Sequence, residues 1–192
     1  MPRILPPGCG ANVSTQWRFV TSRPRAVYDG DRMTIDWLDL RLVPGLHDAT
    51  GRLGMAGLEG ARRLRRQDRV DKLVLLVEDD ELRAAGVPGI VPALAGEGIT
   101  VIRHPIADMG VPTDRAVFRA LLDAVCDDVL GGRTVVVACF GGFGRTGTAV
   151  GCLLVDARLS ADDAIALVRT TRPGTIETRS QEGFVQAWED RG

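Results

Sequence analysis

The sequence predicts an α/β fold with a central, largely parallel sheet of about four to five strands flanked by helices. Three continuous apolar runs, at residues 73–77, 99–102 and 134–137, have the composition of strands that are buried on both faces. Helical patterns lie between these runs. Because strands that alternate with helices are typical of βαβ units, most of the sheet should be parallel.

The first part of the chain predicts no regular element. Residues 1 to about 15 are rich in proline and glycine and lack hydrophobic periodicity. We therefore expect an N-terminal arm at 1–15 and a single domain at 16–192, because a chain of 192 residues suits one core. Within that domain, residues 17–20 and 34–40 alternate apolar and polar side chains, as half-buried strands do.

Periodicity and helix-start signals predict six helical stretches, at about 54–68, 80–96, 113–130, 145–157, 160–171 and 179–189. Pro88 and Pro92 should break the second stretch, because proline lacks the N–H that a helix interior needs. The fourth stretch follows the strand at 134–137 after a short turn. That turn therefore lies at the carboxyl end of a strand, where open α/β sheets bind their ligands.

Composition and charge give no sign of a nucleic-acid or membrane partner. The formal net charge is −1, and no apolar run approaches the length of a membrane span. The first residues lack the apolar core of a secretory signal, so we expect a cytoplasmic protein. The four cysteines, Cys9, Cys126, Cys139 and Cys152, are then expected to be reduced thiols.

The turn after the strand at 134–137 has the composition of an anion-binding loop. Cys139 and Arg145 enclose its five other residues, Phe140, Gly141, Gly142, Phe143 and Gly144. Glycines let the backbone amides converge, and the start of the following helix favours both a thiolate and a phosphoryl dianion. Arg145 can hold two phosphate oxygens in a fork. The pattern predicts a phosphoryl site with a thiolate nucleophile beside it.

A dinucleotide-binding enzyme is the alternative from another class. Gly142, Gly144 and Gly147 also fit the spacing G-x-G-x-x-G after a strand. That fold needs a strand ending in an acidic residue about twenty positions later, but residues 160–169 form a capped amphipathic helix pattern. Nor does the sequence contain the Gly-Lys-Ser/Thr of a nucleoside triphosphate loop. The phosphoryl site is the better interpretation.

Three segments make the sequence resemble the cysteine-dependent protein tyrosine and dual-specificity phosphatases. Residues from Cys139 to Thr146 match the family signature Cys-x5-Arg-Ser/Thr. Upstream, residues 104–112 are similar to the family's general-acid loop and contain Asp108. Downstream, residues 172–181 resemble the segment that ends in its water-positioning glutamine, here Gln181. The resemblance covers roughly residues 34–189, and the chain is most similar to the bacterial and kinase-associated branch.

The resemblance implies a role for each of these residues. Cys139 attacks phosphorus and forms a phosphocysteine, while Arg145 and the amides of residues 140–145 stabilise the phosphoryl oxygens. Asp108 donates a proton to the leaving oxygen and then serves as the base that activates water. Gln181 orients that water, and the Thr146 hydroxyl donates to the cysteine sulfur. The scheme requires no metal and no cofactor.

The expected activity is phosphomonoester hydrolysis, with phosphotyrosine in proteins as the first substrate class and dual specificity as an extension. Two alternatives stay open: a phosphatase of small molecules or inositol phosphates, and a pseudophosphatase that only binds phosphorylated partners. The uncharged Phe140 and Phe143 favour proteins over highly phosphorylated inositols. The expected partner is thus a phosphorylated protein or small phosphoester, with no nucleic acid and no membrane; the sequence does not reveal the oligomeric state.

Several other polar residues have simpler explanations than a role in the site. Asp114 lies where a helix should begin, and capping of that helix accounts for it. His104 precedes a proline at a strand end and suits a packing or hydrogen-bonding role. Cys152, in the predicted helix after the loop, is expected to be a small buried apolar residue rather than a disulfide partner of Cys139.

Overall fold

The structure, a computed structural model, describes residues 34–188 and contains a five-stranded sheet with the strand order β1-β2-β5-β3-β4. The strands are β1 (Asp36–Trp37), β2 (Arg52–Gly57), β3 (Lys72–Leu75), β4 (Thr100–Arg103) and β5 (Thr134–Cys139). The short edge strand β1 pairs antiparallel with β2, and every other pairing is parallel. The largely parallel sheet predicted from the apolar runs is confirmed.

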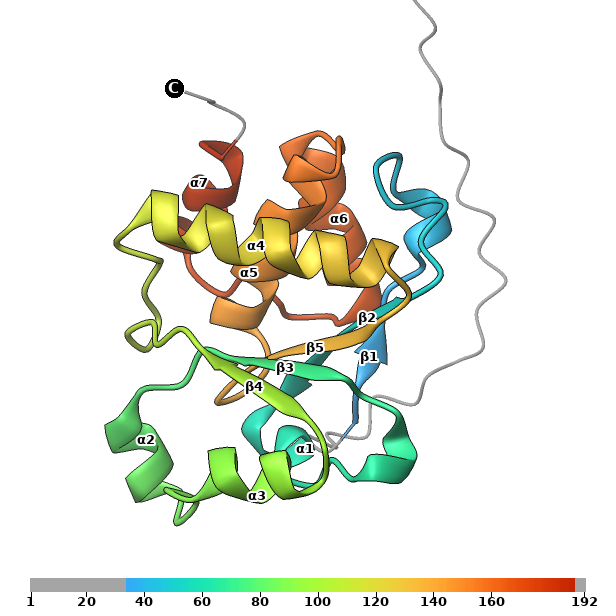
Figure 1. Ribbon diagram of the computed structural model, residues 1–192. Coiled ribbons are helices and arrows are strands. Elements are labelled where there is room, and N and C mark those ends of the chain that lie inside the picture. Colours follow the sequence, from blue (N-terminus) through green and yellow to red (C-terminus); the bar gives the residue numbers. More distant parts are fainter. Residues whose placement is uncertain (1–33, 189–192) are drawn as a thin grey trace, which may run out of the picture. The chain divides into compact units, whose positions relative to one another are not determined.

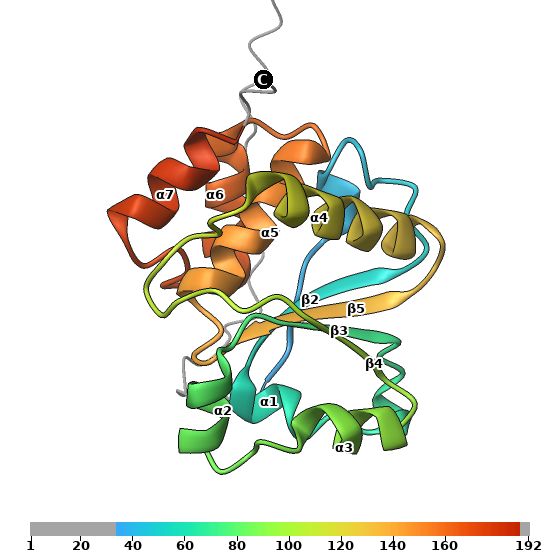
Figure 2. The same ribbon diagram turned by 60° about the vertical axis from the view of Figure 1, so that its left-hand side comes forward.

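Helices cover both faces of the sheet (Figure 1). On one face lie α4 (Arg115–Leu130), α5 (Gly144–Asp156), α6 (Ala161–Thr171) and α7 (Arg179–Gln186). On the other lie α1 (Leu58–Ala61), α2 (Asp79–Ala84) and α3 (Ile90–Gly96). Figure 2 shows the same three layers after rotation. Each layer has its own apolar cluster against the sheet, and side chains of β5 point alternately into the two clusters.

The predicted helix at about 54–68 is wrong over its first part. Residues 52–57 form β2, which pairs with β5 along its whole length, and only the four residues of α1 follow as α-helix. The segment Gly54-Met55-Ala56-Gly57 has no β-branched residue to indicate a strand. Tertiary packing makes this segment a strand. A Cβ on Gly54 would lie 2.9 Å from the Trp37 ring, so the glycine leaves the space that the Trp37 side chain of β1 occupies.

The other predicted elements need smaller corrections. The strand expected at 34–40 shortens to β1, and the stretch at 80–96 divides into α2 and α3. Pro92 is tolerated within the first turn of α3, where its missing N–H has no intrahelical partner. The strand at 17–20 and the arm at 1–15 lie outside the described residues. Within residues 34–188, no helix combines the length and the apolar composition needed to cross a bilayer.

The ends of β2 and β5 lie side by side at the carboxyl edge of the sheet. Gly57, the last residue of β2, pairs with Cys139, the last residue of β5. The next residue of each strand is joined too, because the Leu58 amide donates to the Phe140 carbonyl at 3.0 Å. The turn from β5 to α5 is therefore anchored to its neighbouring strand before it enters the helix.

Candidate active site

The segment from Cys139 to Arg145, here the phosphate loop, folds back over the end of β5. Its cysteine is 2% exposed, and the amide of Gly142 donates to the Cys139 sulfur at 3.3 Å. An N–H directed at sulfur stabilises a thiolate more than a neutral thiol. The last two residues of the loop, Gly144 and Arg145, are the first two residues of α5, and the first amides of a helix have no intrahelical acceptor. The sulfur thus accepts one backbone N–H of the loop, two residues before α5 begins.

Gly142 is the position where this loop requires glycine. Its φ is +78°, a left-handed conformation that side chains with a Cβ disfavour. A Cβ there would also lie 2.6 Å from the backbone of Ala56 and Gly57. The loop can therefore approach β2 closely enough to direct its amide at the sulfur only because residue 142 has no side chain.

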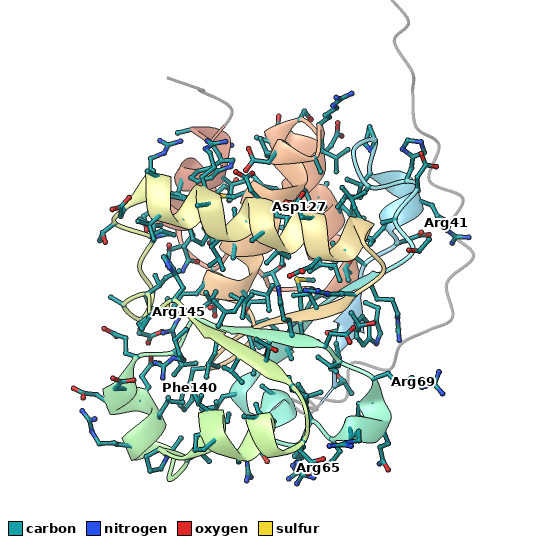
Figure 3. All side chains as sticks on the ribbon, in the orientation of Figure 1. Arg41, Arg65, Arg69, Asp127, Phe140 and Arg145 are labelled. Carbon is teal, nitrogen blue, oxygen red and sulfur yellow. The ribbon has the colours of Figure 1, made fainter. Side chains whose placement is uncertain are left out.

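Arg145 is buried between two carboxylates. Its side chain is 2% exposed, and its Nη1 and Nη2 donate to the Glu81 carboxylate at 2.7 and 2.8 Å. Nη1 also donates to the Ile106 carbonyl at 3.0 Å, and Nη2 lies 3.0 Å from Oδ1 of Asp108. Figure 3 shows Arg145 and Phe140 at the same end of the sheet, close to α2. Arg145 is held in place both by Glu81 of α2 and by Ile106 and Asp108 of residues 104–112.

The arginine and its main partner shift each other's pKa values. Burial alone would raise the pKa of Glu81, but hydrogen bonds from Arg145 and from the Glu78 amide outweigh burial and lower it. Burial likewise opposes the charge on Arg145, but the Glu81 hydrogen bond and the nearby charges of Cys139, Glu81 and Asp108 raise the pKa of the guanidinium. Both groups are therefore charged across the whole neutral range.

Asp108 lies on the acid loop, residues 104–112, in a position that suits a proton donor. Its side chain is 66% exposed although it pairs with the buried Arg145. The loop is fixed on both sides of it, because the Ile106 amide donates to Leu76 in the continuation of β3 and Gln181 donates to the Gly110 carbonyl. A carboxyl group so placed can meet an incoming substrate while its loop stays anchored.

Gln181 and Thr146 are both buried at the site, with different surroundings. Gln181 is 0% exposed, and its Oε1 accepts from the Glu177 and Thr178 amides at the start of α7. Thr146 is equally buried, but among residues 34–188 its hydroxyl has no hydrogen-bond partner. The bond expected from Thr146 to the cysteine sulfur is not formed in this structure, and the roles of both residues stay predictions.

Two residues that organise the site were not predicted from the sequence. Glu81 comes from α2, and nothing in its acidic run signals that it holds Arg145. Arg172 is buried beyond α6, where its Nη1 donates to Asp36 at 2.5 Å and its Nη2 donates to the Gly141 carbonyl at 3.3 Å. Its guanidinium also lies 4.6 Å from the centre of the Phe143 ring. Arg172 therefore braces the phosphate loop against β1.

Apolar and acidic side chains are exposed beside the site. Phe140 is 43% exposed and Met109, next to Asp108, is 50% exposed. Glu177 is exposed. Its carboxylate lies beside the loop, since a Cβ on Gly144 would lie 2.7 Å from Oε2 of Glu177. A rim of this kind suits an aromatic or apolar group next to the phosphoester better than a polyanion.

The remaining candidates behave as packing or capping residues. The Asp114 side chain accepts from the Ala116 and Val117 amides and caps α4, as predicted. The His104 ring packs on Phe118 with centroids 5.3 Å apart, and burial lowers its pKa against the opposing charge of Asp114. Cys152 is fully buried inside α5 as a free thiol, and burial raises its pKa far above the usual range.

Comparisons with known proteins agree with this fold. Kinase associated phosphatase, solved with its catalytic-site cysteine replaced by serine, superposes with a TM-score of 0.74 at 24% identity, covering 82% of this chain and 94% of that chain. Tk-PTP, solved in its active form, gives a TM-score of 0.65 at 31% identity over 74% of this chain and 94% of that one. Human cyclin-dependent kinase inhibitor 3 is 30% identical over 114 residues, which are 58% of this chain and 53% of that protein.

Fold and site together define a cysteine-based phosphatase of the tyrosine and dual-specificity class. The chain belongs to the family described as PTP-SAK, Swiss Army Knife protein, DSP-PTPase phosphatase domain, whose model matches residues 69–185. The chain spans about half the length of the human relative. Its match to zebrafish protein tyrosine phosphatase domain-containing protein 1, 50% identical over 48 residues, covers 24% of this chain and 7% of that protein.

Proposed function

We propose that this protein is a cytoplasmic phosphatase that hydrolyses phosphotyrosine in proteins through a phosphocysteine on Cys139. The observation that carries the proposal is that the phosphate loop contains both a buried cysteine and a buried arginine, each with a contact that suits the chemistry. A buried cysteine sulfur accepts a backbone N–H at 3.3 Å, and six residues later a buried arginine lies 3.0 Å from the exposed Asp108. In this proposal Cys139 is the nucleophile, Arg145 holds the anion, and Asp108, the ion-pair partner of Arg145, donates the proton.

In the first step, the Cys139 thiolate attacks phosphorus, and the bond from phosphorus to the leaving oxygen breaks. The phosphoryl oxygens take hydrogen bonds from the phosphate-loop amides and from the Arg145 fork. Asp108 gives its proton to the leaving oxygen, which departs as a neutral alcohol or phenol. To bind the dianion, Arg145 must exchange part of its contact with Asp108 for the phosphate, and that exchange leaves the carboxyl group facing the leaving oxygen.

In the second step, water attacks the phosphocysteine and releases inorganic phosphate. A new phosphorus–oxygen bond forms, the phosphorus–sulfur bond breaks, and its electron pair returns to Cys139 as a thiolate. The water's proton passes to the Asp108 carboxylate, so the site returns to its starting protonation. Each protein group needed for the cycle comes from the chain itself.

The rim supports phosphotyrosine as the first substrate class. Phe140 and Met109 offer apolar surface next to the phosphate loop, and the carboxylates of Asp108 and Glu177 repel further phosphates on a substrate. The names of two relatives, protein tyrosine phosphatase domain-containing protein 1 and dual specificity protein phosphatase CDC14C, point the same way. The proposal extends to phosphoserine and phosphothreonine, and comparison of phosphotyrosine and phosphoserine peptides measures this extension.

The experiment measures phosphate release by wild type and by Cys139→Ser from a phosphotyrosine peptide, a phosphoserine peptide and a soluble inositol phosphate, with a metal chelator present. We expect release from phosphotyrosine to be fastest, and Cys139→Ser to abolish release while still binding inorganic phosphate. A serine variant as active as wild type would refute the cysteine mechanism. Fastest release from the inositol phosphate would refute the substrate class, and no release from any substrate would favour a phosphate-binding module.

A further inference from the structure

A run of arginines precedes β3, at the end of the sheet away from Cys139. Five of residues 62–69 are arginines and one is an aspartate, although the whole chain has a formal net charge of −1. All six of these charged side chains are exposed. Figure 3 shows Arg65 and Arg69 well apart from Arg145. Residues 62–69, here the arginine segment, therefore form a positive surface on a chain that is acidic elsewhere.

An open hollow of about 640 Å³ lies beside the arginine segment. Arg66 and Arg69 line it on the side of this segment. Gly98, which precedes β4, and Gly132 and Thr134, at the start of β5, line it on the side of the sheet. Arg66 reaches toward that side, since a Cβ on Gly98 would lie 3.9 Å from Nη2 of Arg66. A hollow of this volume has room for several side chains of a ligand.

The carboxylates that border the hollow are already engaged with backbone amides. Oδ2 of Asp71 accepts from the Thr134 amide at 2.7 Å, and Oε2 of Glu97 accepts from the Arg66 amide at 3.1 Å. Each bond joins two segments that are distant in sequence. These carboxylates therefore hold the walls of the hollow together and leave the guanidinium of Arg66 without an acceptor.

Arg66 and Arg69 carry the unpaired charges of the hollow. Within the described part of the chain, neither guanidinium has an ion-pair or hydrogen-bond partner. Their neighbours Arg62 and Arg63 differ, because both pair with Glu59. A guanidinium without a partner keeps its forked donors free for the two oxygens of a carboxylate or phosphate. The hollow thus presents two free cationic forks.

The lining of the hollow favours an acidic peptide over a nucleic acid. Among the described residues that line it, none is aromatic, so bases would have no ring on which to stack. Asp71 and Glu97 also border the hollow and would repel a continuous chain of phosphates. Residues 1–33 of the chain itself contain more arginines than carboxylates, so they do not suit as the acidic occupant.

We propose that this hollow binds an acidic segment of the protein substrate, whose carboxylates pair with Arg66 and Arg69. The link to a substrate rests on the function proposed above, whereas the binding of acidic peptide does not. Thr134 at the hollow and Cys139 at the active site are the two ends of β5. Five steps of about 3.3 Å place them roughly 17 Å apart, so one substrate chain can reach both only through a long spacer.

The distance gives the proposal opposite signs for near and far acidic residues. Next to the phosphotyrosine, acidic residues meet the carboxylates of Asp108 and Glu177, which repel them. Beyond a long spacer, the same residues reach the hollow and raise the effective concentration of the phosphotyrosine at Cys139. Docking of this kind lowers KM and leaves kcat unchanged, because it does not touch the reacting atoms.

The first arm of the test measures binding without catalysis. Fluorescence anisotropy at low ionic strength follows a labelled, unphosphorylated glutamate peptide. We expect wild type to bind it about fivefold or more tightly than the double variant Arg66→Gln/Arg69→Gln, and NaCl at about 0.5 M to remove the difference. Arg158→Gln is the matched control and should bind like wild type. Arg158 is also exposed and left-handed, with a φ of 74° against 53° for Arg69, but it follows α5 and does not line the hollow.

The second arm measures steady-state kinetics with three phosphotyrosine peptides. One carries a glutamate tail on a Gly/Ser spacer of about 15 residues, whose average length of about 20 Å suits the span. The second carries a glutamine tail on the same spacer, and the third has the glutamates next to the phosphotyrosine. We expect the distant glutamates to lower KM by about threefold or more relative to glutamines, at equal kcat, in wild type but not in the double variant. The adjacent glutamates should raise KM in both proteins.

The possible failures can be told apart. If wild type binds the glutamate peptide but releases no phosphate from any peptide, the proposed function fails and the peptide site stands. If wild type turns over and its KM is the same for the distant glutamate and glutamine tails, docking of the substrate is refuted. If a single-stranded oligonucleotide binds more tightly than the glutamate peptide and the double variant loses it, the hollow is a nucleic-acid site instead.

Discussion

At the scale of single residues, the proposed chemistry depends on an acid, Asp108, that is also paired with Arg145. Asp108 is exposed to solvent and at the same time 3.0 Å from Arg145. Its function as a proton donor should therefore be visible in how the rate depends on the leaving group, since a weakly basic leaving oxygen needs less help from a proton.

We predict that Asp108→Asn lowers kcat on phosphotyrosine by about a hundredfold or more, and lowers kcat on p-nitrophenyl phosphate much less. The measurement is steady-state kinetics with both substrates. Asp114→Asn is the control, because asparagine also caps a helix and should leave the ratio between the two substrates unchanged. Equal losses on both substrates in Asp108→Asn would assign the proton to another group.

Glu81 offers a residue-scale prediction about pH. Its pKa is lowered in the folded protein, so its pairing with Arg145 stabilises the fold above the pKa of the unfolded chain and is lost as the pH falls through the folded value. We predict that Glu81→Gln lowers the free energy of unfolding by about 1–2 kcal/mol at neutral pH. The difference from wild type should be complete above about pH 5 and should shrink below about pH 4.

Urea unfolding of both proteins across this pH range measures the effect. A difference that stays constant down to strongly acidic pH would show that Glu81 acts through packing rather than through its charge. Glu81→Gln should also raise KM for phosphotyrosine more than it lowers kcat, because it loosens the group that binds the phosphate in both the ground state and the transition state.

At the scale of elements, the phosphate loop is supported by segments that are distant in sequence. Arg172 joins the end of α6 to Asp36 in β1 and to the loop carbonyl of Gly141, and it stacks on Phe143. A break in this contact removes the hydrogen bonds that Arg172 donates to the Gly141 carbonyl and to the Asp36 carboxylate. The loop should then be less well ordered for its ligand.

We predict that Arg172→Ala lowers the free energy of unfolding by about 1–3 kcal/mol and weakens binding of inorganic phosphate. Urea unfolding and calorimetric titration measure the two effects. A double-mutant cycle with Asp36→Asn should give a favourable coupling energy between Arg172 and Asp36. Strict additivity in that cycle would show that the pair carries no energy of its own.

The sequence predicted the elements that carry a strong local signal. The apolar runs of β3, β4 and β5 and the capped helices α4 and α6 could be placed to within a few residues. The strand β2 was missed, because Gly-Met-Ala-Gly has no strand propensity and becomes a strand through pairing with β5. In the site, the signature from Cys139 to Thr146 and the acid loop were readable as spacings.

The residues that support the phosphate loop could not be predicted from the sequence, for a physical reason. Glu81 reaches the phosphate loop from α2, and Arg172 and Glu177 reach it from the segment between α6 and α7. Their contacts exist only after the layers have packed. An acidic run before a helix is usually explained by helix capping, and α2 does use Glu78 and Glu81 in that way. The second use of Glu81, in holding Arg145, leaves no trace in local sequence.

At the scale of the whole molecule, the reactivity of Cys126 and Cys152 reports whether the core is folded. Burial raises the pKa of Cys126 to about 12 and that of Cys152 further still, so both thiols are protonated and shielded at neutral pH. We predict that iodoacetamide at about pH 8 labels neither in the native protein, and that both become reactive with the same urea midpoint as tryptophan fluorescence. Peptide mass spectrometry identifies the labelled sites. Fast labelling of Cys152 without urea would reveal local opening of α5.

The burial of Arg145 has a consequence for the way the protein meets other anions. Its side chain is 2% exposed, so mobile salt ions have little access to the charge, and screening acts weakly on groups inside the protein. A surface cluster of arginines attracts nucleotides, polyphosphates and chloride alike, and loses its hold as ionic strength rises. Phe140, in the phosphate loop, and Met109, next to Asp108, are the exposed apolar residues on the segments that flank this cation. We therefore expect phosphate binding at this site to weaken less with rising ionic strength than binding to such a surface cluster would.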